Sequence, residues 1–157
     1  MTSAVLLGGL FIGVLSALPI VNIANCCCLW ILGGGALAAA LAQQDDPQPL
    51  GLLEGARIGF RAGLVGAVIW LVVSMAVDVM IAPLQQRAAD IMLRNATDMP
   101  PEVRVWLESI GDRASAPQRV VVSFLFQLLV ATPFAALGGL LGAALVRREA
   151  PAAQGEP

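Results

Sequence analysis

The amino-acid sequence predicts an all-α fold, a polytopic membrane bundle of four transmembrane helices with one short interfacial amphipathic helix. The composition is the first indication, because 58% of the 157 residues are hydrophobic and only 13% are charged, whereas a soluble domain has about 25% charged residues. The second is the placement of the charges, since none precedes Asp45 and none lies between Arg119 and Arg147. These uncharged runs of 44 and 27 residues exceed the roughly 20 residues of a membrane-spanning helix.

Residues 1–44 are predicted to form a transmembrane hairpin of two short spans, near 4–21 and 26–42. Each span is at the short limit for a full crossing, and the asparagines between them favour a turn. A cleaved signal peptide is the alternative, but no basic residue precedes the apolar run. Lipoprotein processing before Cys26 fits less well, because the chain after it stays apolar where a polar tether is expected.

The polar loop of residues 45–56 contains two prolines and includes the start of the next helix, whose apolar part predicts a third span over 57–83. A fourth span is predicted over 118–148, where two arginines end it, and 149–157 is expected to be a disordered tail. Four spans place both chain termini on the same side of the membrane.

Residues 84–117 are expected to form an extramembrane loop with an amphipathic helix. Four apolar residues there recur at i, i+3, i+4 and i+7, which puts them on one helix face: Val103, Trp106, Leu107 and Ile110. Such a helix lies at the level of the lipid headgroups, with Trp106, like Trp30 in the second span, as an interfacial anchor. The alternative is that this helix packs on the mouth of the bundle itself.

Arginines are expected to set the orientation, since cytoplasmic loops carry an excess of basic residues close to span ends. The side that holds both termini has its arginines at the ends of spans: Arg57, Arg61, Arg147 and Arg148. The opposite side has five arginines, but they are spread through a loop with five acidic residues, so we expect cytoplasmic termini. All nine basic residues are arginine, which, with the many alanines and glycines, favours a bacterial source and hence the bacterial inner (plasma) membrane.

Small residues recur at intervals of four in every predicted span. The clearest row contains four glycines at the start of the third helix: Gly51, Gly55, Gly59 and Gly63. The other spans have related positions: Gly9, Gly13, Gly35, Gly139 and Gly142. Spacing by four keeps such residues on one helix face, and small faces let helices approach closely in lipid, as in a glycine zipper. These rows either close the bundle, form an interface between copies of the chain, or line a pore.

The composition excludes several kinds of chemistry. The absence of histidine, tyrosine and lysine removes imidazole bases, imidazole metal ligands and lysine Schiff bases. No glycine-rich phosphate-binding motif is present, and a net charge of -2 gives no reason to expect nucleic acid as a partner. We expect no enzymatic activity, no cofactor and no metal. The expected partners are membrane lipid and either further copies of the chain or the subunits of a membrane complex.

Asp78 is the ionisable residue that lies well inside an apolar run. A carboxylate in such a position is a candidate functional group, and proton or cation coupling is one interpretation. Asp78 lies only about 7 Å along a helix from Pro83, at interfacial depth. An ion pair with Arg119 or solvation by the loop is therefore the simpler interpretation.

A second candidate site is a charged helix face. Arg57 and Arg61 share this face with Glu54 and, with the pair Arg147 and Arg148, are candidates for binding anionic lipid headgroups. An ion pair within the helix is the alternative.

The three consecutive cysteines, Cys26, Cys27 and Cys28, form a candidate thiol site. Adjacent helical positions point about 100° apart, so the three thiols of one chain cannot form a tetrahedral metal site alone. Thiol redox chemistry, disulfides between chains and a metal shared by several copies remain alternatives to small apolar filler.

The stretches PIVNIANCCCLWILGGGALAAALAQ and GLLEGARIGFRAGLVGAVIW resemble a loose group of uncharacterised small bacterial membrane proteins. These share an apolar hairpin with an Asn-Cys-Cys turn and a Gly-Ala-rich third helix. The resemblance covers roughly residues 5–80 and does not include the loop after the third span. It implies four spans and brings no catalytic residues.

From these observations we expect a non-enzymatic integral membrane subunit or scaffold. It would associate through its small-residue helix faces with itself or with a larger membrane complex. An oligomeric small channel or transporter component is the alternative.

Overall fold

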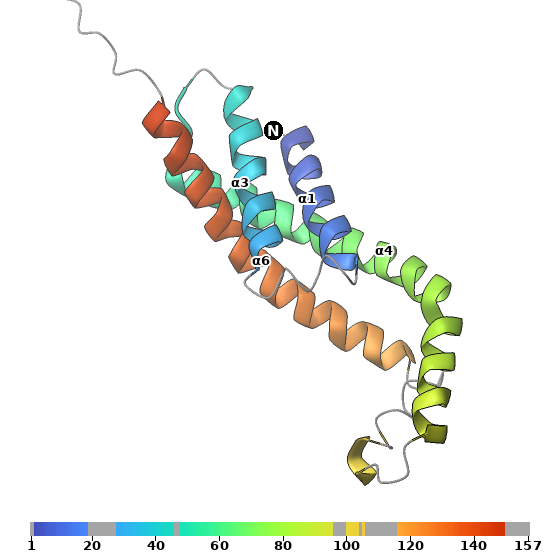
Figure 1. Cartoon of the computed structure of the whole chain (residues 1–157). Coiled ribbons are helices and arrows are strands. Elements are labelled where there is room, and N and C mark those ends of the chain that lie inside the picture. The colour runs from blue at the N-terminus through green and yellow to red at the C-terminus, as the bar shows by residue number, and fades with distance from the viewer. Residues whose placement is uncertain are drawn as a thin grey trace, which may run out of the picture.

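The computed structural model describes residues 2–18, 28–45, 48–95, 100–103, 105 and 116–149. Most of these residues belong to four helices: α1 (Thr2–Ala17), α3 (Leu29–Gln44), α4 (Leu52–Asn95) and α6 (Ala116–Glu149). No strand occurs among them, which confirms the all-α prediction. Figure 1 shows α1 and α3 as a short hairpin that lies against the much longer α4 and α6.

Two of the helices are long and apolar enough to cross a membrane, over Leu52–Met92 and Pro117–Val146. α1 and α3 are apolar as well, but each has only 16 residues. At about 1.5 Å per residue each is about 24 Å long, less than the roughly 30 Å of a bilayer core. Crossing by four helices therefore stays a prediction.

Several helix ends differ from the predicted bounds. α3 begins at Leu29, after Cys28, whose backbone is left-handed with φ at 54°, a conformation that residues with a side chain rarely adopt. α4 continues through Pro83 to Asn95. A proline removes one backbone hydrogen bond and bends a helix, and the residues after Pro83 include strong helix formers that propagate it.

Three predicted features lie wholly or largely outside the described residues. They are the turn of the hairpin with its asparagines and two of its cysteines, most of the amphipathic helix including Trp106, and the tail from residue 150.

The four helices form a ring with one diagonal contact. α4 packs most extensively on α6, α1 packs on α4 and α3, and α3 packs on α6 and across the diagonal on α4. α4 and α6 are antiparallel, because Gly55 faces Gly139 while Gly63 faces Ala131. The α3–α4 contact closes the centre of the ring.

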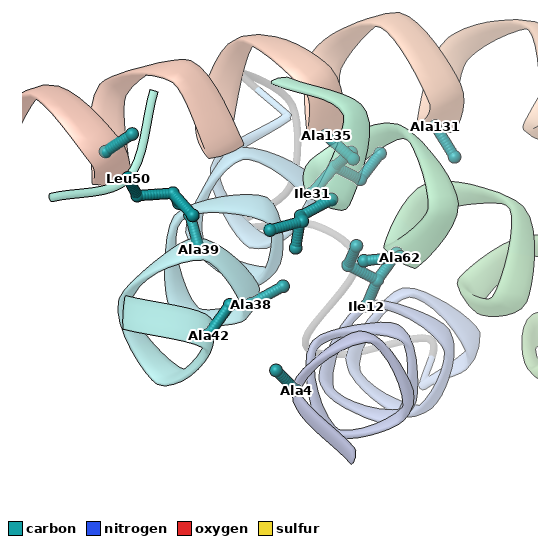
Figure 2. Close-up of a cluster of buried hydrophobic side chains, with 12 residues drawn as sticks. Ala4, Ile12, Ile31, Ala38, Ala39, Ala42, Leu50, Ala62, Ala131 and Ala135 are labelled. Carbon is teal, nitrogen blue, oxygen red and sulfur yellow. The ribbon is translucent and has the colours of Figure 1, made fainter. Parts of the chain in front are cut away.

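The core is made almost entirely of small side chains. Its large, fully buried members are Ile12, Ile31 and Ile58. The others, apart from Leu50, are alanines: Ala4, Ala38, Ala39, Ala42, Ala62, Ala131, Ala135 and Ala143. Figure 2 shows these side chains gathered where α1, α3, α4 and α6 meet. Small side chains occupy little volume between helices, so the four helix backbones can approach one another closely.

The Gln43 side chain holds the described part of the loop between α3 and α4. The Gln43 amide nitrogen donates to the Gln48 carbonyl at 2.8 Å, and the Gln43 amide oxygen accepts from the Leu50 backbone N–H. Leu50 is thereby placed in the core, where it is 3% exposed. This loop returns the chain from the end of α3 to the start of α4 on the same side of the bundle.

The hairpin covers only part of the length of α4 and α6. The Trp70 indole nitrogen donates to the Ser16 carbonyl at 3.2 Å, so the end of α1 lies level with the middle of α4. Past this level α4 and α6 continue beyond the end of α1, and Figure 1 shows the far part of α4 bending away. We call residues 71–92 of α4 and 117–127 of α6 the distal segment.

Candidate functional site

The glycine row of α4 lies directly against α6. A Cβ atom placed on Gly55 would be 2.6 Å from the Gly139 carbonyl oxygen, and one on Gly63 would be 2.8 Å from the Ala131 carbonyl oxygen. A Cβ on Gly59 would overlap the Ala135 carbonyl oxygen. These obstacles are backbone atoms, which cannot rotate away as a side chain can. Only glycine therefore fits at these three positions of α4.

The other predicted glycines lie in contacts of the same kind. Gly9 and Gly13 of α1 face Val65 and Ile69 of α4, so α1 and α4 are parallel. The remaining three lie between α3 and α6 or between α4 and α6: Gly35 against Ala135, Gly142 against Ala36, and Gly139 against Gly55. Gly51 precedes α4, and its carbonyl accepts the Gly55 N–H at 2.8 Å.

Four further glycines make equally close contacts, and of these the spacing pattern indicates Gly138 alone, four residues before Gly142. They are Gly8 and Gly34, which face α3 and α1 respectively, Gly66, which faces Ile12, and Gly138, which faces Leu32. The signal was present, because Gly8 and Gly34 each have a small or core residue four positions later. Glycines adjacent in the sequence give more than one possible series at intervals of four, so the spacing does not show which series contacts another helix.

The glycine faces of the described helices do not line an opening. Each of the close contacts above is with a neighbouring helix of the same chain. The centre of the ring is filled by the alanine and isoleucine core. In the part of the chain that the structure describes, the small-residue rows therefore hold the bundle together.

Asp78 and Arg119 are both exposed, on α4 and near the start of α6. Extending the antiparallel register of the glycine contacts puts Asp78 level with residues 116–120, which include Arg119. The ion pair between these two side chains stays a prediction. An exposed carboxylate within an apolar stretch of helix needs water, a cation or another protein group beside it.

Polar groups cluster at the level where α1 ends. The Ser16 hydroxyl and the Gln127 amide nitrogen are buried and have no hydrogen-bond partner among the described residues. The Trp70 indole bonds to the Ser16 carbonyl rather than to the hydroxyl. The sequence alone did not reveal the role of Trp70, because a contact between residues 54 positions apart has no local signal.

The charged face of α4 lines an open depression at the start of that helix. Its described lining includes Glu54, Arg57 and Arg61, and all three side chains are exposed. Arg147 and Arg148 belong to the last turn of α6, which lies at the same end of the bundle because α4 and α6 are antiparallel. Lipid binding by these arginines stays a prediction.

The described cysteine, Cys28, is a free, half-buried thiol before α3, while Cys26 and Cys27 lie outside the described residues. No group of histidine, cysteine, aspartate or glutamate that could hold a metal ion occurs in the described ranges. Trp30 packs edge-to-face on Phe11, with ring centroids 6.2 Å apart. This contact joins α3 to α1 near the end of the hairpin.

Comparison of the chain with known proteins gives no match, whether with family models, with curated proteins or with solved structures. A function for the chain must therefore be inferred from its own residues.

Proposed function

We propose that the chain is a non-enzymatic integral membrane subunit whose outer surface contacts lipid and partner helices. The observation that carries this proposal is an inverted distribution of side chains. The buried positions are mainly alanine and glycine, whereas large apolar side chains are exposed on all four helices. A soluble protein has the opposite arrangement.

The extent to which large apolar side chains are exposed favours a lipid environment. Val79 is 78% exposed, Met80 is 79% exposed and Leu129 is 72% exposed. Fully burying one side chain of this kind contributes about 1.5–3 kcal/mol in water, and soluble monomers rarely expose apolar patches larger than a few hundred Å². Exposure of these side chains to water therefore forgoes this free energy. In a bilayer they contact hydrocarbon instead, so their exposure carries no such cost.

The distal segment is the surface we propose for association with a partner helix. The glycine rows are already covered by helices of the same chain, so association needs another face. Lipid provides no hydrophobic drive between helices, and packing and polar contacts must hold them together. The distal segment offers both, because Asp78 and Ser123 are exposed there among large apolar side chains such as Met75 and Phe126.

A small channel or transporter component is the second candidate function. The exposed carboxylate of Asp78 favours it, since an intramembrane carboxylate can coordinate a cation or carry a proton. With the centre of one chain closed by its core, a pathway would have to lie between several copies, with Asp78 facing it.

The first experiment separates membrane insertion from surface attachment. The tagged chain is expressed in bacteria, and the membranes are washed with alkaline carbonate. We expect the protein to stay in the pellet and to need detergent for extraction. A chain that is soluble without detergent contradicts the proposal.

The second experiment separates the two candidate functions. Native mass spectrometry in mild detergent gives the stoichiometry, and liposomes that contain the purified protein report cation or proton flux. A subunit or scaffold shows a defined oligomer or a co-purified partner without flux. A channel or transporter shows flux that is lost in Asp78→Asn, a variant that keeps the shape of the side chain.

A further inference from the structure

We propose that α1 and α3 form a re-entrant hairpin, which enters the bilayer from one side and ends near its middle, while α4 and α6 cross it completely. This inference rests on the proposed membrane function and adds its topology. It replaces four full crossings by two crossings and one half-inserted hairpin. Both termini remain on the same side in either arrangement.

The charges of α4 provide a depth scale. Arg61 is the last charged residue before the apolar stretch, and Pro83 with the glutamines and arginine after it ends that stretch. From Arg61 to Ala82 the helix rises about 32 Å, which matches the roughly 30 Å of a bilayer core. Arg61 therefore lies at one boundary of the core and Ala82 at the other.

The end of α1 falls near the middle of this scale. Gly13 of α1 contacts Gly66 and Ile69, and the Ser16 carbonyl accepts from the Trp70 indole at 3.2 Å. Trp70 is nine residues after Arg61, about 14 Å into the core. Another 18 Å or so of α4 separates Trp70 from Ala82. α1 ends one residue after Ser16.

The alternative placement centres the bilayer on the hairpin so that α1 and α3 cross most of it. That placement moves Arg61 to the middle of the hydrocarbon, because Gly9 in the middle of α1 contacts Ala62 and Val65. An exposed arginine at the bilayer centre is strongly disfavoured. With the hairpin half-inserted, Arg61 can extend to the headgroups, and Asp78 lies about 6 Å from the far boundary.

The half-inserted hairpin means that the two leaflets surround different numbers of helices. Among the described residues, four helices occupy the leaflet on the side of the termini, and the distal segment of α4 and α6 occupies the other. The exposed apolar side chains of that segment, Val79 and Val122 among them, face the far leaflet. This is the surface that lipid or a partner helix fills beside the hairpin tip.

Cys28, directly before α3, makes the depth measurable, because the chain has only two other cysteines to replace. In the variant Cys26→Ser/Cys27→Ser, Cys28 is the remaining thiol. The two matched controls are Asp45→Cys and Glu102→Cys, each in a chain whose three native cysteines are replaced by serine. Vesicles of both orientations are treated with a membrane-impermeant maleimide under reducing conditions.

We expect Asp45→Cys to react from one face and Glu102→Cys from the other. The maleimide should not label Cys28 from either face, and Cys28 should react only after the vesicles are dissolved in SDS. Labelling of Cys28 from the face that labels Glu102→Cys would show a full crossing and overturn the inference. Labelling from the face that labels Asp45→Cys would place the hairpin outside the bilayer core and overturn it as well.

Tryptophan quenching checks that lipid rather than protein protects the tip. In Trp70→Phe/Trp106→Phe the remaining fluorophore is Trp30, close to Cys28. Quenching should be strongest for lipids brominated near the ends of their acyl chains, and quenching that is strongest for bromine near the headgroups refutes the half-depth position. Release of the protein by carbonate would instead refute the proposed membrane function, so the two failures are distinguishable.

Discussion

Replacing Gly59 by alanine adds one methyl group where the backbones of α4 and α6 touch. The new Cβ would overlap the Ala135 carbonyl oxygen and lie about 3.0 Å from the Gly139 Cα atom. Neither atom belongs to a side chain that can rotate away. The two helices must therefore move apart locally, and the adjacent contact of Gly55 with Gly139 loosens with them.

Two opposing effects set the magnitude. Alanine has a higher helix propensity than glycine, which by itself stabilises a helix by about 0.5–1 kcal/mol. Inserting a methyl group into a close-packed contact costs about 1–3 kcal/mol, and more where the neighbours cannot adjust. Because the obstacle here is backbone, the steric effect is the larger. We expect Gly59→Ala to lower the free energy of unfolding by about 1–2 kcal/mol.

Gly33→Ala is the matched control. Gly33 is an exposed helical glycine of α3, and a Cβ there would meet only the Phe11 ring at 3.7 Å, an ordinary contact. This variant keeps the propensity gain without the clash, so it should be unchanged or more stable by up to about 1 kcal/mol. Unfolding is followed by circular dichroism during SDS titration in mixed micelles. Equal stability of Gly59→Ala and Gly33→Ala would show that α4 and α6 do not touch at this glycine.

Three further tests address other contacts, and two of them use the same titration. Trp70→Phe removes the hydrogen bond to Ser16 while keeping most of the ring, and should lower stability by about 0.5–1.5 kcal/mol; no change would mean that the bond does not tie α1 to α4. Gln43→Ala removes the hydrogen bonds of this side chain to Gln48 and Leu50 and should speed proteolytic cleavage between α3 and α4, whereas an unchanged cleavage rate would mean that the loop is held by other contacts. A double-mutant cycle of Asp78→Asn and Arg119→Gln should give a coupling below about 1 kcal/mol, because both side chains are exposed; a larger coupling would indicate a desolvated ion pair.

Much of the fold could be predicted from local sequence signals. The long uncharged runs predicted apolar helices: α1 and α3 lie within the first run, and α6 covers the second. α4 covers the third predicted span. Helix ends were harder, since α4 passes through Pro83. A proline disfavours a helix locally, but good helix formers on both sides outweigh it.

The candidate site was predictable in kind and less so in detail. Spacing by four identified Gly55, Gly59 and Gly63 as one face, and that face does lie against another helix. The spacing does not say which helix, because small faces are nearly interchangeable as partners. Contacts such as Trp70 with Ser16 join residues far apart in the chain and depend on how the helices are placed.

Composition and charge placement by themselves determined that this chain forms apolar helices with small-residue faces, because both properties follow from residues close together along the chain. Only the tertiary structure decided that those faces meet inside one chain, with Gly59 on Ala135 and Gly13 on Gly66. It also decided that α1 ends level with Trp70. The physical reason is that contact between helices depends on their relative register and depth, which no single helix encodes alone.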